Sequence, residues 1–168
     1  MIEIVLPKNN EAEFIEIASK LGIKKLCFLY NFDKYNEQKV QYKLESIKNY
    51  KNIDVETGLI ANRKNLNKSY KKSKLLVVKS SDQDRYFIES KKIRLIYGFE
   101  ETHKKDYLHQ RASGLNQHIC ELANKNNVSV GFSYGLLFNK NSMLASMIIG
   151  RMMQNISLCE KYKVKMVI

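Results

Sequence analysis

The feature of this chain that most constrains its fold is a regular alternation of short apolar runs with longer amphipathic stretches. The apolar runs have the composition of strands that are buried on both faces, as KLCFLY at residues 25–30 and LLVVK at residues 75–79 illustrate. The stretches between them place apolar residues at helical spacing, and Gly22 directly after residues 11–21 is a typical helix end. Such alternation predicts a parallel sheet within an α/β fold.

The same pattern predicts the positions of the individual elements. Seven strands are expected, at residues 2–6, 25–30, 53–60, 75–79, 93–99, 128–133 and 164–168. Five helices are expected, at residues 11–21, 37–50, 82–90, 113–126 and 142–162, with Asp82 as an N-cap. Residues 62–73 are basic and show no clear periodicity, so we expect an irregular segment there.

Two architectures fit this order of elements: an open doubly wound sheet and a TIM-like (β/α) barrel. A full eight-unit barrel takes about 250 residues, whereas this chain has 168 residues, or 24 for each of seven units. A barrel would therefore be compact and incomplete. One proline and no Gly/Ser-rich linker predict a single domain over residues 1–168. Because the last predicted strand runs to the final residue, we expect a C-terminal segment to be missing or to come from elsewhere.

Several classes of protein are disfavoured by the composition. No apolar run approaches the roughly 18–20 residues that span a bilayer, so we expect no membrane association. The N-terminus has no basic leader and no small-residue cleavage site, which argues against a signal peptide. Cys27, Cys120 and Cys159 are odd in number and widely spaced, which predicts free buried thiols in a reducing compartment. We therefore expect a cytoplasmic protein without a disulfide scaffold or a cysteine zinc site.

Charge is the most informative part of the composition. The chain carries 29 Lys and Arg against 17 Asp and Glu, for a formal net charge of +12. The excess is uneven, because no acidic residue occurs between Thr57 and Ser81 or between Leu122 and Cys159. An excess of this size favours a polyanionic partner, first of all nucleic acid. A Lys-rich proteome that uses lysine as a generic surface residue is the alternative explanation.

Motifs for catalysis are sparse. All three histidines, His103, His109 and His118, lie close together in sequence, but they form neither H-x-H nor H-E-x-x-H. No phosphate-binding glycine loop and no G-x-S-x-G elbow occurs. Gly131 and Gly135 flank Ser133, in a pattern more typical of a strand exit and turn. We therefore expect no catalytic site, no metal and no other cofactor.

The best candidate for binding is the polar segment at residues 99–112, which follows a predicted strand and precedes a predicted helix. Ligands bind at the carboxyl edge of such sheets, and a helix starting at Ser113 would add N–H donors for a phosphate. Arg63 and Lys64 come from the first acid-free stretch and Arg151 from the second. Four tyrosines that are interleaved with basic residues could stack on bases, namely Tyr70, Tyr86, Tyr107 and Tyr134. The complete set of RNA-binding candidates is Arg85, Lys104, Lys105, His109, Arg111, Arg63, Lys64 and Arg151.

Three stretches resemble the archaeal family of ribonuclease P protein component 3, the thirty-kilodalton-class subunit. They are RYFIESKKIRLIYGFE at residues 85–100, RASGLNQHICELANKNNVSVGFS at residues 111–133 and GRMMQNISLCEKYKVKMVI at residues 150–168. The opening residues fit the family's first βα unit, and the resemblance is weakest over residues 36–73. It implies a barrel related to the polymerase-and-histidinol-phosphatase (PHP) superfamily.

The resemblance also implies a function. Ribonuclease P removes the 5′ leader of precursor tRNA, and in this family the RNA subunit carries out the catalysis. The protein would bind ribonuclease P RNA, a ferredoxin-like protein called component 2 and other ribonuclease P proteins, and would meet precursor tRNA indirectly. Arg85 matches a family arginine implicated in function, and Arg111 belongs to the family's basic loop, where Gln110 replaces an arginine of some relatives.

Two other functions remain open from the sequence. The first is a PHP-like metal-dependent phosphoesterase, although this chain has Leu6-Pro7-Lys8 where such relatives carry H-x-H. The second is an unrelated basic RNA-binding protein. Metal content and co-purification with ribonuclease P RNA distinguish these alternatives from a ribonuclease P subunit.

Overall fold

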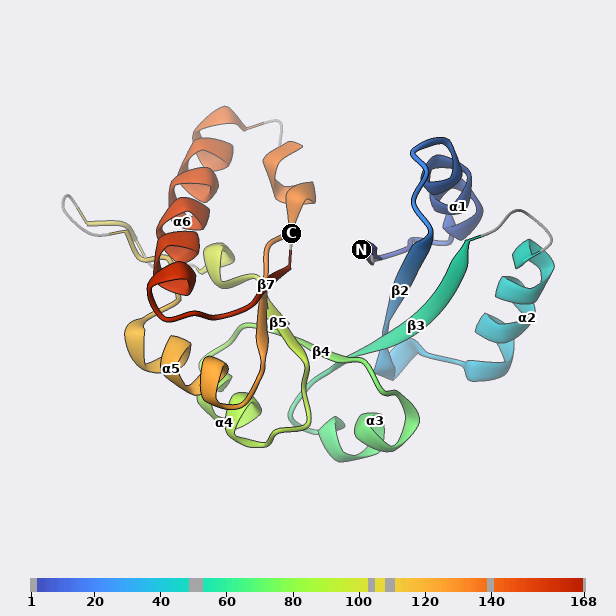
Figure 1. The fold of residues 1–168 in the computed structure, drawn as a ribbon, viewed down its shortest axis with the longest axis horizontal. Helices are drawn as coiled ribbons and strands as arrows, with labels where there is room; N and C mark the ends of the chain where they lie inside the picture. The colour runs from blue at the N-terminus through green and yellow to red at the C-terminus, as the bar shows by residue number, and fades with distance from the viewer. Residues whose placement is uncertain (1–2, 49–52, 103–104, 108–110, 139–140, 168) are drawn as a thin grey trace. The chain divides into compact units, whose positions relative to one another are not determined.

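The computed structural model describes residues 3–48, 53–102, 105–107, 111–138 and 141–167. Its contacts divide the chain into two compact units, Met1–Leu76 and Val77–Ile168. Each unit is built of parallel strands joined by helices (Figure 1), and each is described by itself.

The described residues of the first unit form three parallel strands and three α-helices, besides the short 3-10 helix η1 (Phe32–Lys34). The strands are β1 (Glu3–Val5), β2 (Lys25–Asn31) and β3 (Asp54–Ala61), and the helices are α1 (Glu11–Lys20), α2 (Glu37–Lys48) and α3 (Leu66–Lys72). Strand β2 is central, because it pairs with both β1 and β3. Its middle residues are buried, as expected for a strand covered on both faces.

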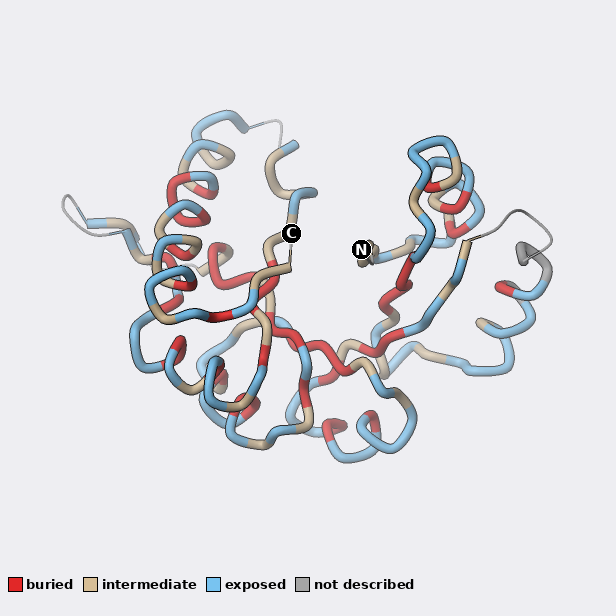
Figure 2. Tube along the Cα trace, in the orientation of Figure 1, coloured by how far each residue is buried: buried red, intermediate tan, exposed pale blue. Residues whose placement is uncertain are grey.

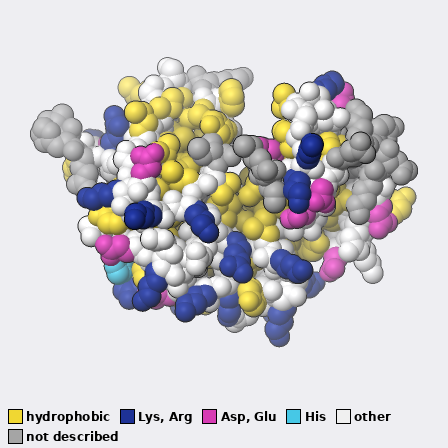
Figure 3. Space-filling model, viewed as in Figure 1, with side chains coloured by type: hydrophobic (Ala, Val, Ile, Leu, Met, Phe, Trp, Pro, Cys, Tyr) yellow, Lys and Arg dark blue, Asp and Glu magenta, His cyan; other side chains and the backbone are white. Residues whose placement is uncertain are grey.

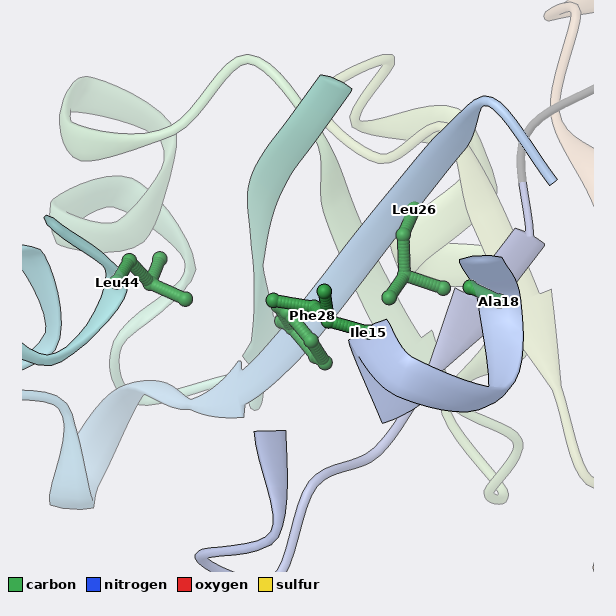
Figure 4. Packing of buried hydrophobic residues seen from close by; sticks show 5 residues of the cluster. All are labelled: Ile15, Ala18, Leu26, Phe28 and Leu44. Carbon is green, nitrogen blue, oxygen red and sulfur yellow. The ribbon is translucent and has the colours of Figure 1, made fainter. Parts of the chain in front are cut away.

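A hydrophobic cluster holds the helices of this unit against β2 (Figure 4). Ile15 and Ala18 of α1 and Leu44 of α2 lie around Leu26 and Phe28 of the strand. Because Ile15 and Ala18 are three residues apart, they share one face of the helix and can both contact the sheet. The helical spacing in the sequence therefore becomes the packing surface of α1.

The described residues of the second unit form four strands and three α-helices, besides two short 3-10 helices. The strands are β4 (Leu76–Lys79), which begins at the unit boundary, β5 (Leu95–Tyr97), β6 (Ser129–Gly131) and β7 (Met166–Val167). The helices are α4 (Asp84–Glu89), α5 (Gln117–Lys125) and α6 (Ser142–Lys161). Buried residues (red in Figure 2) follow the strands and the helix faces turned toward them.

The strand order decides between the two expected architectures. The seven strands are neighbours in the order β1-β2-β3-β4-β5-β6-β7, and the described pairs are parallel. A doubly wound sheet reverses its strand order at a switch point, and no reversal occurs here. The topology is that of a TIM-like barrel with seven strands instead of eight, so the α/β, incomplete-barrel prediction is confirmed.

Three expectations about individual elements were wrong. The segment predicted to be irregular contains α3. Helix α4 begins at Asp84, so Asp82 is not its N-cap. Helix α5 begins at Gln117 instead of residue 113, because Gly114 has a φ of 80° and Asn116 is the N-cap, its side chain accepting a hydrogen bond from Ile119 N.

The prediction that the cysteines are free and buried is confirmed for Cys27, Cys120 and Cys159. Burial, together with the nearby charge of Glu56, raises the pKa of the Cys27 thiol to about 12. Among the helices that the structure describes, none combines the length and the apolar character needed to cross a membrane.

Candidate nucleic-acid interface

The candidate segment leaves the carboxyl end of β5 through a backbone turn that requires glycine. Gly98 has a φ of 82°, in the left-handed region, and is followed by the short helix η2 (Phe99–Glu101). Phe99 and Glu100 are buried at its base. Burial raises the pKa of the Glu100 carboxyl, although a hydrogen bond from Ser133 N opposes this shift. The segment therefore starts from a fixed, buried position.

Arg151 of α6 anchors the middle of the segment. Its residue surface is only 1% exposed. Nε and Nη2 both lie 2.9 Å from Asp106 Oδ1, and Nη1 donates to the backbone carbonyls of Glu100 and Thr102 at 3.1 and 2.8 Å. The guanidinium thus ties η2 and Asp106 to one helix. A buried charge is tolerated when it is paired and hydrogen-bonded in this way.

Asp106 is the counter-charge of this anchor. Its Oδ1 also accepts a hydrogen bond from Ala112 N at 2.8 Å. Desolvation raises the pKa of Asp106, but the hydrogen bonds from Arg151 and Ala112 outweigh it and bring the pKa below its usual value. The carboxylate is therefore ionised at neutral pH and closes the segment between Asp106 and Ala112.

Arg111 lies against the next turn of the same helix. Its Nη1 donates to the Gly150 carbonyl at 3.0 Å, while the residue as a whole is exposed. Gln154 Nε2 donates to the Arg111 carbonyl at 3.1 Å and to Ser113 Oγ at 2.9 Å. Asn155 Nδ2 donates to the Ser113 carbonyl at 3.0 Å. Helix α6 therefore fixes the backbone from the Arg111 carbonyl to Ser113.

The structure corrects the phosphate site expected at Ser113. Ser113 is 1% exposed and its hydroxyl is engaged by Gln154, so it does not open a helix toward solvent. The helix starts later, and the side chain of Asn116 occupies its N-terminus. Among the described residues of the predicted site, Lys105 and Arg111 remain as exposed basic side chains.

The other predicted residues fall into three groups. Lys104 and His109 lie outside the described residues. Arg151 has a structural role within the protein instead of a surface position, because its guanidinium is buried and bonded to protein oxygens. Arg85 is exposed on α4 and forms an ion pair with Glu89 at 2.8 Å.

Arg63 and Lys64 are exposed in the turn between β3 and α3 of the first unit. This turn has its own carboxylate anchor. Asp33 accepts hydrogen bonds from the side-chain amides of Asn62 and Asn65, both at 2.9 Å. Because Asp33 follows β2 while the two asparagines follow β3, the anchor joins the loops at the carboxyl ends of two paired strands.

The basic helix α3 was missed as a candidate. Lys68, Lys71 and Lys72 are exposed on it, and Tyr70 is 53% exposed between them. In Figure 3, dark blue Lys and Arg side chains stand out on α3, and also on α4 and α5. The buried residues of α3, Leu66 and Ser69, are three positions apart, and this helical spacing is the sequence pattern that could have predicted the helix.

A different surface lies beside α6. The short helix η3 (Tyr134–Phe138) and α6 enclose a pocket of about 190 Å³ with almost purely apolar walls. Phe132, Leu137, Ile149 and Met153 are among its lining residues, and hydrophobic side chains (yellow) are visible on this face in Figure 3. Such a pocket suits an apolar group and not a phosphate.

Metal chemistry has no visible site in the parts of the chain that the structure describes. There, no three His, Cys, Asp or Glu side chains are grouped so that they could hold a metal ion. The Arg151 guanidinium contacts Asp106 and the backbone carbonyls of Glu100 and Thr102, so this arrangement fixes the loop.

Comparison with solved structures identifies the fold that this chain shares. No protein-family model matches the chain, and no curated protein matches its sequence. A chain in a solved structure described as "cryo-EM structure of archaeal Ribonuclease P with mature tRNA" superposes with a TM-score of 0.81 at 17% identity. The similarity covers 99% of this chain and 72% of that chain. At this identity the likeness establishes a shared fold.

Proposed function

We propose that this chain is a protein subunit of ribonuclease P, specifically its component 3, and that it supports the catalytic RNA instead of carrying out the chemistry itself. It would bind ribonuclease P RNA and other protein subunits, among them the ferredoxin-like component 2. The leader of precursor tRNA would then be removed by the assembled complex, in the cytoplasm.

The observation that carries the proposal is the fold match. Nearly the whole chain, 99% of it, follows the path of a chain in an archaeal ribonuclease P structure. TIM-like folds host many functions, so a fold match alone is an analogy. Here it coincides with the three family-like stretches and with a net charge of +12, which are independent of it.

The chemistry of the surface supports RNA as the partner. Exposed Lys and Arg side chains attract phosphates, and an Arg guanidinium can hold a phosphate through two parallel hydrogen bonds. Lys105 and Arg111 are offered from a segment that α6 holds in place. The tyrosines at 70, 86 and 107 are also exposed and offer flat faces for unpaired bases.

Reconstitution tests the proposal. The protein is combined with an archaeal ribonuclease P RNA and component 2, and cleavage of precursor tRNA is measured at limiting protein. We expect the protein to raise cleavage, and Arg111→Ala to lower it. Arg94→Ala is the matched control, because Arg94 is exposed just before β5 and so at the opposite, amino edge of that strand.

The outcomes separate the alternatives. Equal cleavage with and without the protein would contradict the proposal. Metal-dependent hydrolysis of a model phosphoester by the pure protein would favour the phosphoesterase. Tight binding to unrelated RNAs without stimulation of cleavage would favour a general RNA-binding protein.

A further inference from the structure

Gly150 lies in the interior of α6, where the backbone conformation does not require glycine. Gly150 is the ninth residue of a 20-residue helix. Its φ is not in the left-handed region, so any residue could adopt its conformation. Glycine weakens a helix interior compared with alanine, because it loses more backbone freedom when the helix forms. Its presence therefore calls for a reason outside the helix backbone.

The reason lies in the space that a side chain would occupy. A Cβ atom built on Gly150 would lie 2.6 Å from Cζ of Arg111 and 2.8 Å from both Nε and Nη1. All three atoms belong to the guanidinium end of Arg111. The same guanidinium donates to the Gly150 carbonyl at 3.0 Å. The absent side chain is thus replaced by the charged end of a residue 39 positions earlier in the chain.

We propose that Gly150 is a positioning residue: it forms a seat on α6 that fixes the guanidinium of Arg111 for contact with an RNA phosphate. The inference rests on the proposed function. A surface arginine usually has no such contact to hold its guanidinium in place. An exposed arginine loses side-chain freedom when it binds, and a guanidinium that is already held loses less.

Other contacts hold the backbone near Arg111, so the seat at Gly150 acts on the Arg111 side chain. The backbone near Arg111 is held independently of Gly150, through Gln154 on its carbonyl and through the Asp106–Arg151 pair. The three atoms nearest to the missing Cβ position all belong to the flexible end of Arg111. Replacing Gly150 by Ala should therefore move the guanidinium while the segment and the helix keep their places.

Nη1 makes the contact with the Gly150 carbonyl, and an Arg side chain has five N–H donors in total. The guanidinium can therefore rest on the helix and still offer donors to a phosphate. A Lys at position 111 would lack the planar group that fills the seat, which makes Arg111→Lys a useful comparison.

The first experiment uses the free protein and needs no RNA. The side-chain Nε–H resonance of Arg111 is assigned by NMR as the signal that Arg111→Lys removes, and it is compared between wild type and Gly150→Ala. We expect Gly150→Ala to shift this resonance and to melt at the same or a higher temperature. An unshifted resonance, or a lower melting temperature, would overturn the inference.

The second experiment measures binding to an archaeal ribonuclease P RNA over a range of salt concentrations. Arg111→Ala should reduce the slope of log K against log salt by about 0.7–0.9, the value for one phosphate contact. Gly150→Ala should weaken binding toward the level of Arg111→Ala, and the double variant should be no weaker than Arg111→Ala alone. Arg94→Ala serves as the charge-matched control for a general loss of positive charge.

The results distinguish this inference from the proposed function. If Arg111→Ala weakens binding and Gly150→Ala does not, the seat is refuted while the function stands. If the double variant is weaker than Arg111→Ala, Gly150 acts through another contact and the seat is again refuted. If the wild type does not bind this RNA, the proposed function fails, and the positioning role fails with it.

Discussion

Each unit has a basic loop that is held by an aspartate. The loops are the turn after β3 in the first unit and the segment after β5 in the second. In the first unit, Asp33 accepts hydrogen bonds from the neutral amides of Asn62 and Asn65. In the second unit, Asp106 accepts hydrogen bonds from the buried guanidinium of Arg151. Both loops carry exposed basic side chains, but the groups that bond to the two carboxylates differ in charge and in burial.

This difference determines what each loop loses when its carboxylate is removed. Without Asp33, the exposed amide of Asn62 and the buried amide of Asn65 would each lose one hydrogen bond. Without Asp106, a guanidinium whose side chain is 2% exposed would lose the carboxylate that its Nε and Nη2 contact. Removing the carboxylate partner of a buried charge costs much more than removing the partner of a neutral amide. The second loop is therefore the more fragile of the two.

The largest effect is expected for Asp106→Ala. Breaking a buried ion pair by removing one partner costs about 3–5 kcal/mol of unfolding free energy, and we expect a loss in this range. Urea unfolding followed by circular dichroism measures it. A loss below about 1 kcal/mol, the range of a surface ion pair, would show that Arg151 does not depend on Asp106.

The difference in unfolding free energy between wild type and Asp106→Ala should also depend on pH. Hydrogen bonds from Arg151 and Ala112 lower the pKa of Asp106 in the folded state, whereas an unfolded Asp titrates near 3.9. The stabilisation should therefore be complete above the unfolded pKa and decline as pH falls through the lower folded pKa. We expect the difference between wild type and Asp106→Ala to be constant from neutral pH to about pH 5 and to shrink below pH 4.

A smaller effect is expected for Asp33→Ala in the first unit. Removing one hydrogen-bond partner of a buried amide costs about 1–3 kcal/mol, and Asp33 itself is exposed, so we expect the lower half of that range. Hydrogen exchange of the Lys64 and Asn65 amides should also increase, because both donate to Asn62 Oδ1 within the anchored turn. A loss equal to that of Asp106→Ala would remove the distinction between the two anchors.

The smallest effect is expected for Glu89→Ala. Glu89 pairs with Arg85 across one turn of α4, with side chains 45% and 67% exposed. Exposed pairs of this spacing contribute about 0.3–0.5 kcal/mol. Removing Glu89 also frees Arg85, so binding to RNA should be unchanged or slightly stronger. Weaker RNA binding by this stable variant would contradict the assignment of Arg85 as an RNA-binding residue.

The sequence predicted the architecture well because strand and helix periods are local properties. All seven strands were found, and each differed from its predicted range mainly at the ends, where 93–99 shortened to Leu95–Tyr97. The error at α5 had a local physical cause, since Gly114 adopts a positive φ and its position is packed against the carbonyl of Phe99. A helical apolar pattern cannot report such a close approach.

The candidate site was harder to predict because it depends on contacts across long sequence separations. Arg151 looked like a surface cation in an acid-free stretch, but its partner Asp106 lies 45 residues earlier. Gly150 gave no signal at all, because its role is visible only in the position of Arg111. Residue type and spacing identify basic segments, whereas the fold decides which of their charges face inward.

Direct RNA binding tests the central claim most simply. The affinity of the wild-type protein for an archaeal ribonuclease P RNA is compared, across a salt series, with its affinity for an unrelated structured RNA of the same length. We predict tighter binding to ribonuclease P RNA at every salt concentration, with each phosphate contact contributing about −0.7 to −0.9 to the slope of log K against log salt. Equal affinity for the two RNAs, or no binding to either, would contradict the account.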